Sequence, residues 1–122
     1  MKIDFGFGTG IQSVEIPENN LIEVLNPNTV ELGLTGEEEV IRALEHPIGS
    51  KPLGEIVKPG EKIVIISSDI TRPMPTYRVM PALLDTLYKA GIDKKDITLV
   101  LGLGIHRPHT DAERKKLAGE RA

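Results

Sequence analysis

The sequence predicts an α/β chain in which a small amino-terminal antiparallel sheet is followed by β-loop-α repeats with parallel strands, as in an incomplete Rossmann-like domain. Two observations predict this fold. Apolar and polar residues alternate near the start of the chain, which is the period of a half-buried strand. From residue 61 onward, an apolar run, a polar loop and a helical apolar stripe follow one another, and the same order then begins again.

We expect this pattern to divide the chain into three segments. Residues 1–34 form a β-rich amino-terminal segment, and residues 35–60 a helix with a linker rich in proline and glycine. Residues 61–122 form the β-loop-α repeat, as the truncated part of a larger domain. Since two parallel strands are too few to cover themselves, we expect a missing carboxyl-terminal part or a partner chain to complete the sheet.

Composition excludes several classes of protein. The 122 residues contain no cysteine, which rules out a disulfide framework, a zinc ribbon and a thiol nucleophile. A net charge of −3 offers no strong attraction for nucleic acid. No stretch has the length and apolar content of a signal peptide or a membrane span. We therefore expect a cytoplasmic protein that binds neither nucleic acid nor membrane.

The expected elements of the first thirty residues are short strands. Residues 3–7 alternate in polarity and lead into Gly8-Thr9-Gly10, which predicts a strand and a turn. A second strand is expected through Val14 and Ile16, and a short third strand over residues 21–25.

A helix is predicted over residues 36–45, where apolar residues recur at helical spacing. Thr35 and Glu38 have the spacing of a capping box at its start. Residues 47–60 contain three prolines and three glycines, which indicate a loop that is not regular throughout.

The first β-loop-α unit follows this loop. Residues 63–66 are an unbroken β-branched run, which is typical of a strand buried on both faces. Residues 80–88 carry an apolar stripe at helical spacing. We place Pro81 in the first turn of that helix and Gly91 at its end.

The second unit repeats the pattern with a strand over residues 97–101 and a helix that begins at Thr110, which again has capping-box spacing to Glu113. Parallel strands place their following loops at the same edge of a sheet, so the polar residues of the two loops should face one crevice. These residues are Ser67, Ser68, Asp69, Thr71, Arg72, His106, Arg107 and His109.

The first loop has the side chains of an anion site. The functional interpretation makes Arg72 a planar fork for a carboxylate or phosphate, with Asp69 as its orienting partner or as a contact to the ligand. The alternative is a capped turn in which Asp69 or Thr71 bonds nearby backbone N–H groups.

The second loop offers a histidine. His106 can accept and return a proton near neutral pH, although a loop histidine is often only a surface residue. His106 and His109 have an H-x-x-H spacing, but no third ligand stands out, and we assign no metal ligand in this chain.

The runs Asp69-x-Thr71-Arg72-Pro73-x-Pro75 and Gly104-Ile105-His106-Arg107-Pro108 together resemble the lactate racemase family of nickel-pincer-nucleotide enzymes. The resemblance implies interconversion of D- and L-2-hydroxy acids. In the family mechanism a histidine removes the hydroxyl proton while the C2 hydride passes to the cofactor, and its return to the other face inverts the centre.

The resemblance also implies roles for individual residues. His106 is similar to one of two catalytic acid/base histidines, Arg72 to the arginine that binds the substrate carboxylate, and Asp69 to a carboxylate beside the cofactor ring. Thr71 and Arg107 are further candidates for cofactor binding. The family's second histidine, its cofactor-tethering lysine and its nickel-binding histidine have no counterparts here, so the nickel-pincer nucleotide is expected to be tethered outside this chain.

Two other functions stay open at the level of sequence. The chain fits a non-catalytic α/β module that binds a small anion or nucleotide through the Arg72 loop, and it fits a structural domain completed by a partner chain. As part of a racemase it is expected to contribute half a site for a small 2-hydroxy acid and to be inactive alone.

Overall fold

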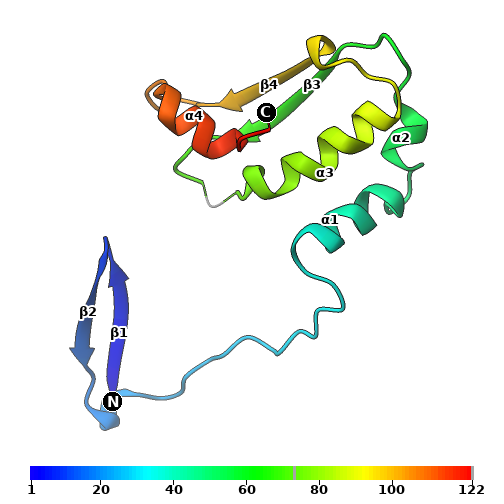
Figure 1. Cartoon of the computed structure of the whole chain (residues 1–122). Coiled ribbons are helices and arrows are strands. Elements are labelled where there is room, and N and C mark those ends of the chain that lie inside the picture. The colour runs from blue at the N-terminus through cyan, green and yellow to red at the C-terminus, as the bar shows by residue number, and fades with distance from the viewer. Residues whose placement is uncertain (73, 122) are drawn as a thin grey trace. The chain divides into compact units, whose positions relative to one another are not determined.

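The computed structural model describes residues 1–72 and 74–121, which form two compact units, Met1–Glu31 and Leu32–Ala122. Figure 1 shows the elements of each unit. Within the described residues, no helix combines the length and the apolar character that crossing a membrane requires. The division into segments 1–34, 35–60 and 61–122 stays a prediction.

The first unit is a β-hairpin. Strands β1 (Lys2–Phe7) and β2 (Gly10–Glu15) pair antiparallel, and Gly8 in the connecting turn takes a φ of +59°, which glycine adopts without a steric penalty. A short 3₁₀ helix, η1, covers Glu18–Asn20. The predicted strand over residues 21–25 is wrong, because these residues form no strand. Apolar residues alone do not make a strand, which also needs a neighbouring backbone with which to pair.

The second unit begins with helix α1 (Gly36–Glu45), which confirms the helix predicted over these residues. The predicted capping box is wrong, since the Thr35 side chain makes no hydrogen bond to the helix. Gly36 takes a φ of +60° at the first helical position, so the chain enters the helix in a direction that differs from ordinary capping geometry. The loop that follows contains only one short helix, α2 (Leu53–Ile56).

The predicted parallel strand pair is confirmed. Strand β3 (Ile63–Ser68) pairs with β4 (Ile97–Gly102) in a parallel register that sets Ser68 beside Gly102. Helix α3 (Thr76–Lys89) and the short 3₁₀ helix η2 (Lys94–Asp96) lie between the strands in the chain. Both following loops therefore start at the same edge of the sheet (Figure 1).

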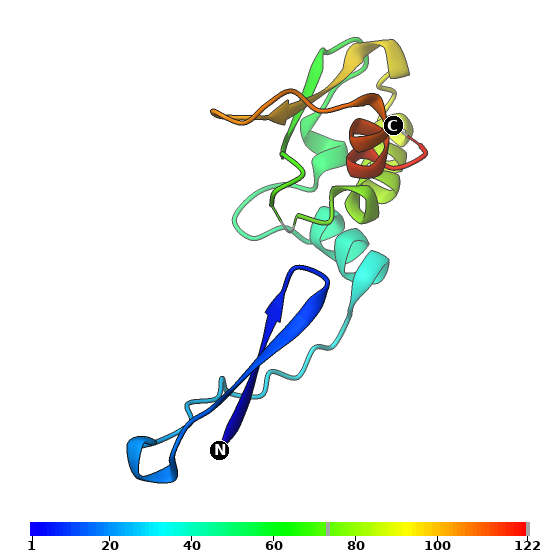
Figure 2. The ribbon, with the colours of Figure 1, turned by 90° about the vertical axis from the view of Figure 1, so that its left-hand side faces the viewer.

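Helices cover one face of this sheet. Figure 2 shows α3 and α4 (Asp111–Ala118) on the same side of the strands. The buried apolar side chains of the second unit are Met80, Ala82, Leu84, Leu87, Ile92 and Leu117. On the other face Val64 and Ile66 are 59% and 76% exposed, so the prediction that this strand is buried on both faces is wrong for the chain described here. A single helical layer can bury only the side chains that point toward it.

Helix α3 begins earlier than its apolar stripe. Its first residue is Thr76, so Pro81 is the sixth residue and lies in the second turn, which corrects the placement of Pro81 in the first turn. The Thr76 hydroxyl is buried and lies 2.5 Å from the Ser67 hydroxyl on β3, and this contact holds the start of the helix against the sheet. The helix thus begins five residues before Pro81, although Pro81 has no N–H with which to make a helical hydrogen bond.

Gly91 terminates α3 as predicted. It follows the last helical residues with a φ of +87°, the Gly91 N–H donates to the Tyr88 carbonyl, and the Ile92 N–H donates to the Leu87 carbonyl. These two bonds form a Schellman motif, which satisfies carbonyls that the helix leaves free.

We expect Gly91→Ala to destabilise the fold more than Gly60→Ala, although both glycines have nearly the same positive φ. A Cβ at Gly91 would lie 2.8 Å from Pro59 Cγ, whereas a Cβ at Gly60 meets nothing within 4 Å. The left-handed conformation alone costs about 1 kcal/mol, and the overlap should raise the cost at Gly91 to about 2–3 kcal/mol. Thermal unfolding measures both variants, and equal losses would show that Pro59 moves aside freely.

Candidate functional site

The two loops that follow β3 and β4 meet, which confirms their predicted convergence. The Ile70 N–H donates a 3.1 Å hydrogen bond to Nε2 of His109, which is 39 residues away in the chain. One residue earlier, the Asp69 carboxylate contacts the imidazole of His106. The convergence follows from the parallel register, because Ser68 and Gly102 end their strands side by side.

Asp69 is a buried polar residue of this site, with 3% of its surface exposed. Its Oδ1 accepts hydrogen bonds from the N–H and the hydroxyl of Thr71, at 2.9 and 2.7 Å. Its Oδ2 faces Nδ1 of His106. The hydrogen bond from His106 and those from Thr71 hold the pKa of Asp69 far below the ordinary carboxyl value, so the side chain is an anion at any pH near neutrality.

This anion sets the tautomer of His106. A carboxylate can only accept, so Nδ1 of His106 carries the proton that it donates to Asp69. Nε2 is then the ring nitrogen that can exchange a proton with a ligand. The side chain is 43% exposed, and its backbone N–H closes a turn on the Leu103 carbonyl in which Gly104 takes a positive φ. His106 is therefore oriented by a buried partner and open to solvent.

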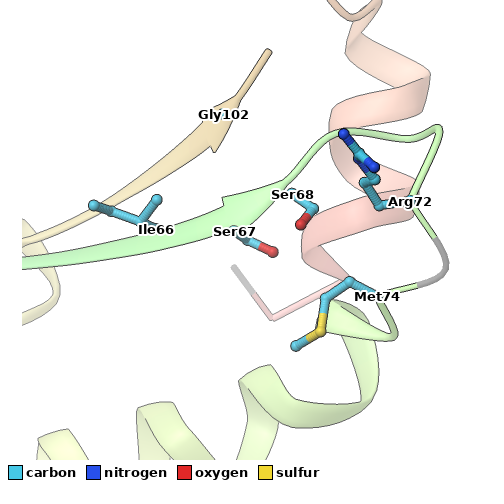
Figure 3. Close-up of a pocket in the computed structure, with 6 residues that line it drawn as sticks. All are labelled: Ile66, Ser67, Ser68, Arg72, Met74 and Gly102. Atoms are coloured by element: carbon cyan, nitrogen blue, oxygen red, sulfur yellow. The ribbon is translucent and has the colours of Figure 1, made fainter. Parts of the chain in front are cut away.

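Arg72 lines a surface pocket at the carboxyl ends of β3 and β4, and neither Asp69 nor His106 is among the lining residues. The pocket has a volume of about 640 Å³, and Figure 3 shows the side chains that line it. They are Ile66, Ser67, Ser68, Arg72, Met74 and Gly102. Within residues 1–72 and 74–121 the Arg72 guanidinium makes no ion pair. Among the described residues, Asp69 bonds Thr71 and His106 and makes no ion pair with Arg72, so the structure does not pair these two side chains as the sequence allowed.

Arg107 lies in the second loop and points to helix α4. Its guanidinium donates to both carboxylate oxygens of Glu113, at 2.9 and 2.7 Å. Thr110 and Glu113 also form the predicted capping box of α4, which is confirmed. The hydrogen bond from Arg107 lowers the pKa of Glu113 to about 2, so this contact stabilises the fold fully above pH 4.5 and is lost as the pH falls toward 2.

The two histidines of the H-x-x-H pattern have separate partners. Nδ1 of His106 faces Asp69, and Nε2 of His109 accepts from the Ile70 backbone. Among the side chains that the structure describes, no group of three or more His, Asp or Glu could hold a metal ion. Pro73, which belongs to the first sequence motif, lies outside the described residues.

Sequence reasoning missed two features of the site. Thr76 is buried and bonds Ser67, so the end of β3, just before the first loop, is tied to the start of α3. Met74 supplies an apolar wall of the Arg72 pocket. The hydroxyl directly after Pro75, at a helix start, was a signal for Thr76, whereas nothing local marks Met74.

Fold and site together define an α/β domain whose site lies at the carboxyl edge of a parallel sheet. This site holds a carboxylate-oriented histidine and an arginine that makes no ion pair with the described residues. The chain belongs to the lactate racemase N-terminal domain family, whose sequence profile matches residues 7–122. It is 32% identical to the lactate racemase of Thermoanaerobacterium thermosaccharolyticum over 98% of this chain and 28% of that protein. It is 40% identical to the lactate racemase of Lactiplantibacillus plantarum over 71% of this chain and 20% of that protein.

A comparison with solved structures gives the same family. The lactate racemase apoprotein from Thermoanaerobacterium thermosaccharolyticum superposes with a TM-score of 0.76 at 31% identity, over 99% of this chain and 28% of that chain. The chain thus spans between a fifth and three tenths of the length of these relatives. The predicted family and the predicted fold class are both confirmed.

Proposed function

We propose that this chain is the amino-terminal part of an enzyme that interconverts the D and L forms of a small 2-hydroxy acid of the lactate type. The relatives support the reaction, since both are lactate racemases. The observation that carries the proposal is the buried Asp69 carboxylate on Nδ1 of His106, because it leaves Nε2 available as a general base.

Arg72 would bind the substrate. Its guanidinium has no ion-pair partner among the described side chains, and its parallel N–H donors match the two oxygens of a carboxylate. The neighbouring hydroxyls of Ser67 and Ser68 line the same pocket and can add hydrogen bonds to an oxygen of the ligand. We assign His106 to the proton of the C2 hydroxyl, which it would take as the hydride leaves C2 and return after the hydride is restored.

The residues present do not supply a metal site for the family's cofactor. Arg72, Ser67 and Ser68 are assigned to the substrate, and the described residues contain no cluster that could ligate the metal of a nickel-pincer nucleotide. When bound, that cofactor would supply the acceptor for the C2 hydride. We place its tether, its metal ligand and the second acid/base group in the rest of the full-length protein.

Asp69 acts in this proposal through His106 rather than by direct contact with the cofactor ring, and Thr71 supports it by holding Oδ1. Arg107 is bound by Glu113, so a role in cofactor binding would require that ion pair to open. Residues 1–122 alone are proposed to be inactive, and a cytoplasmic location stays a prediction.

We expect Arg72→Lys in the full-length enzyme to raise the KM for lactate about tenfold or more, because lysine keeps the charge but loses the two parallel N–H donors. Chiral analysis of the product formed from L-lactate measures the reaction. Arg78→Lys is the matched control, since Arg78 is an exposed cation that lies over the Tyr77 ring. Wild-type protein that binds carboxylates through Arg72 without racemising them would favour a non-catalytic anion-binding module.

A further inference from the structure

His109 is a loop residue that is nearly buried. Only 9% of its surface is exposed, although its neighbours on both sides in the chain are exposed. Its Nε2 accepts the Ile70 N–H at 3.1 Å. Since a backbone N–H can only donate, this ring is neutral and its proton resides on Nδ1. The hydrogen bond joins the second loop to the backbone of the first.

The backbone that carries this imidazole is itself held. The His109 carbonyl accepts a 3.2 Å hydrogen bond from Nη1 of Arg114 on α4. The next residue, Thr110, is the amino-terminal cap of α4. Its N–H donates to the Glu113 carboxylate, and its hydroxyl oxygen accepts from the Glu113 N–H. His109 therefore projects from the fixed start of a helix, which makes it a rigid support for the loop that it contacts.

That loop carries the residues to which we assign chemistry. Ile70 directly follows Asp69, and the Arg72 N–H closes a turn on the Asp69 carbonyl at 3.2 Å. A shift of the Ile70 amide would move the Asp69 carboxylate away from His106 and Arg72 away from its pocket. Positioning errors of this kind reduce rates even when the reacting groups are unchanged.

We propose that His109 is a positioning residue of the racemase site, which holds the loop of Asp69 and Arg72 against the second loop through the acceptor Nε2. The inference rests on the proposed function. It assigns His109 no contact with the substrate. It makes the acceptor at this position, rather than the imidazole itself, the property that matters.

Glutamine and methionine form a matched pair to test this in the full-length enzyme, because they are similar in length and shape and only glutamine provides a good acceptor. We expect H109Q to keep racemisation within about threefold of wild type. H109M should be about five- to tenfold slower than H109Q, the factor that corresponds to one lost neutral hydrogen bond. Hydrogen–deuterium exchange of the segment that contains Ile70 should be fast in H109M and slow in H109Q.

A second comparison separates positioning from general stability. If His109 acts through Asp69, H109M should lower the racemisation rate by a much smaller factor in the D69N variant than in the wild-type enzyme. A merely structural effect would lower the rate by the same factor in both. Equal rates for H109Q and H109M would overturn the proposal, and so would a loss of the fold in H109M, as seen in its melting curve. If exchange at Ile70 differed between H109Q and H109M but the wild-type enzyme did not racemise lactate, the proposed function would be contradicted. The contact between His109 and Ile70 would still be supported.

Discussion

Replacing His106 by asparagine in the full-length protein should lower kcat for racemisation about a hundredfold or more, which is the scale of general acid–base catalysis. The asparagine amide can occupy the place of Nδ1 and still donate to Asp69, so the buried carboxylate keeps a partner. The variant lacks any atom in the place of Nε2. It therefore removes the proposed base with little disturbance of the site around it.

The loss should appear in kcat rather than in KM, because Arg72, and not His106, is assigned to the substrate carboxylate. His46→Asn is the control, since His46 is an exposed residue at the end of α1. Racemisation by H106N at a rate close to that of wild type, with the fold intact by circular dichroism, would remove His106 from the mechanism.

Asp69→Asn should lower kcat by a factor similar to that of H106N, about a hundredfold or more, although asparagine has the same shape. Thr71 donates both its N–H and its hydroxyl to one oxygen at this position, which requires the amide oxygen there and turns the NH₂ group toward His106. Nδ1 of His106 must then accept, and the proton moves to Nε2. The imidazole in that tautomer cannot take the proton of a substrate hydroxyl.

This prediction distinguishes a tautomer effect from a loss of charge. A crystal structure of D69N should show the His106 ring in its original place while activity is lost. Asp93→Asn provides the matched control, because Asp93 is 68% exposed and pairs only with Lys95 among the described residues. Full activity in D69N would mean that Asp69 does not set the state of His106.

Elements whose signals are local were predictable from the sequence. The helix over residues 36–45 and the capping box of Thr110 and Glu113 depend on residues within one or two turns of each other. The parallel pairing of β3 and β4 followed from the repeated β-loop-α order, which allows few connections. The convergence of the two loops was a consequence of that topology.

The wrong predictions concern features that depend on residues far away in the chain. Residues 21–25 have strand-like composition, but they pair with no strand in the described part of the chain. The apolar run of β3 indicated burial on both faces, yet helices of this chain cover only one. The contact of Thr76 with Ser67 begins α3 before its apolar stripe, which moved Pro81 from the first turn to the second.

The sequence by itself determined the family, the order of the elements and the set of polar residues at the edge of the sheet. These follow from residue types and short spacings, which are readable along one chain. The tertiary structure decided that Asp69 faces His106 rather than Arg72, and that His109 supports the Ile70 backbone. Such pairings depend on side-chain directions across 37 and 39 residues of chain, and only packing determines them.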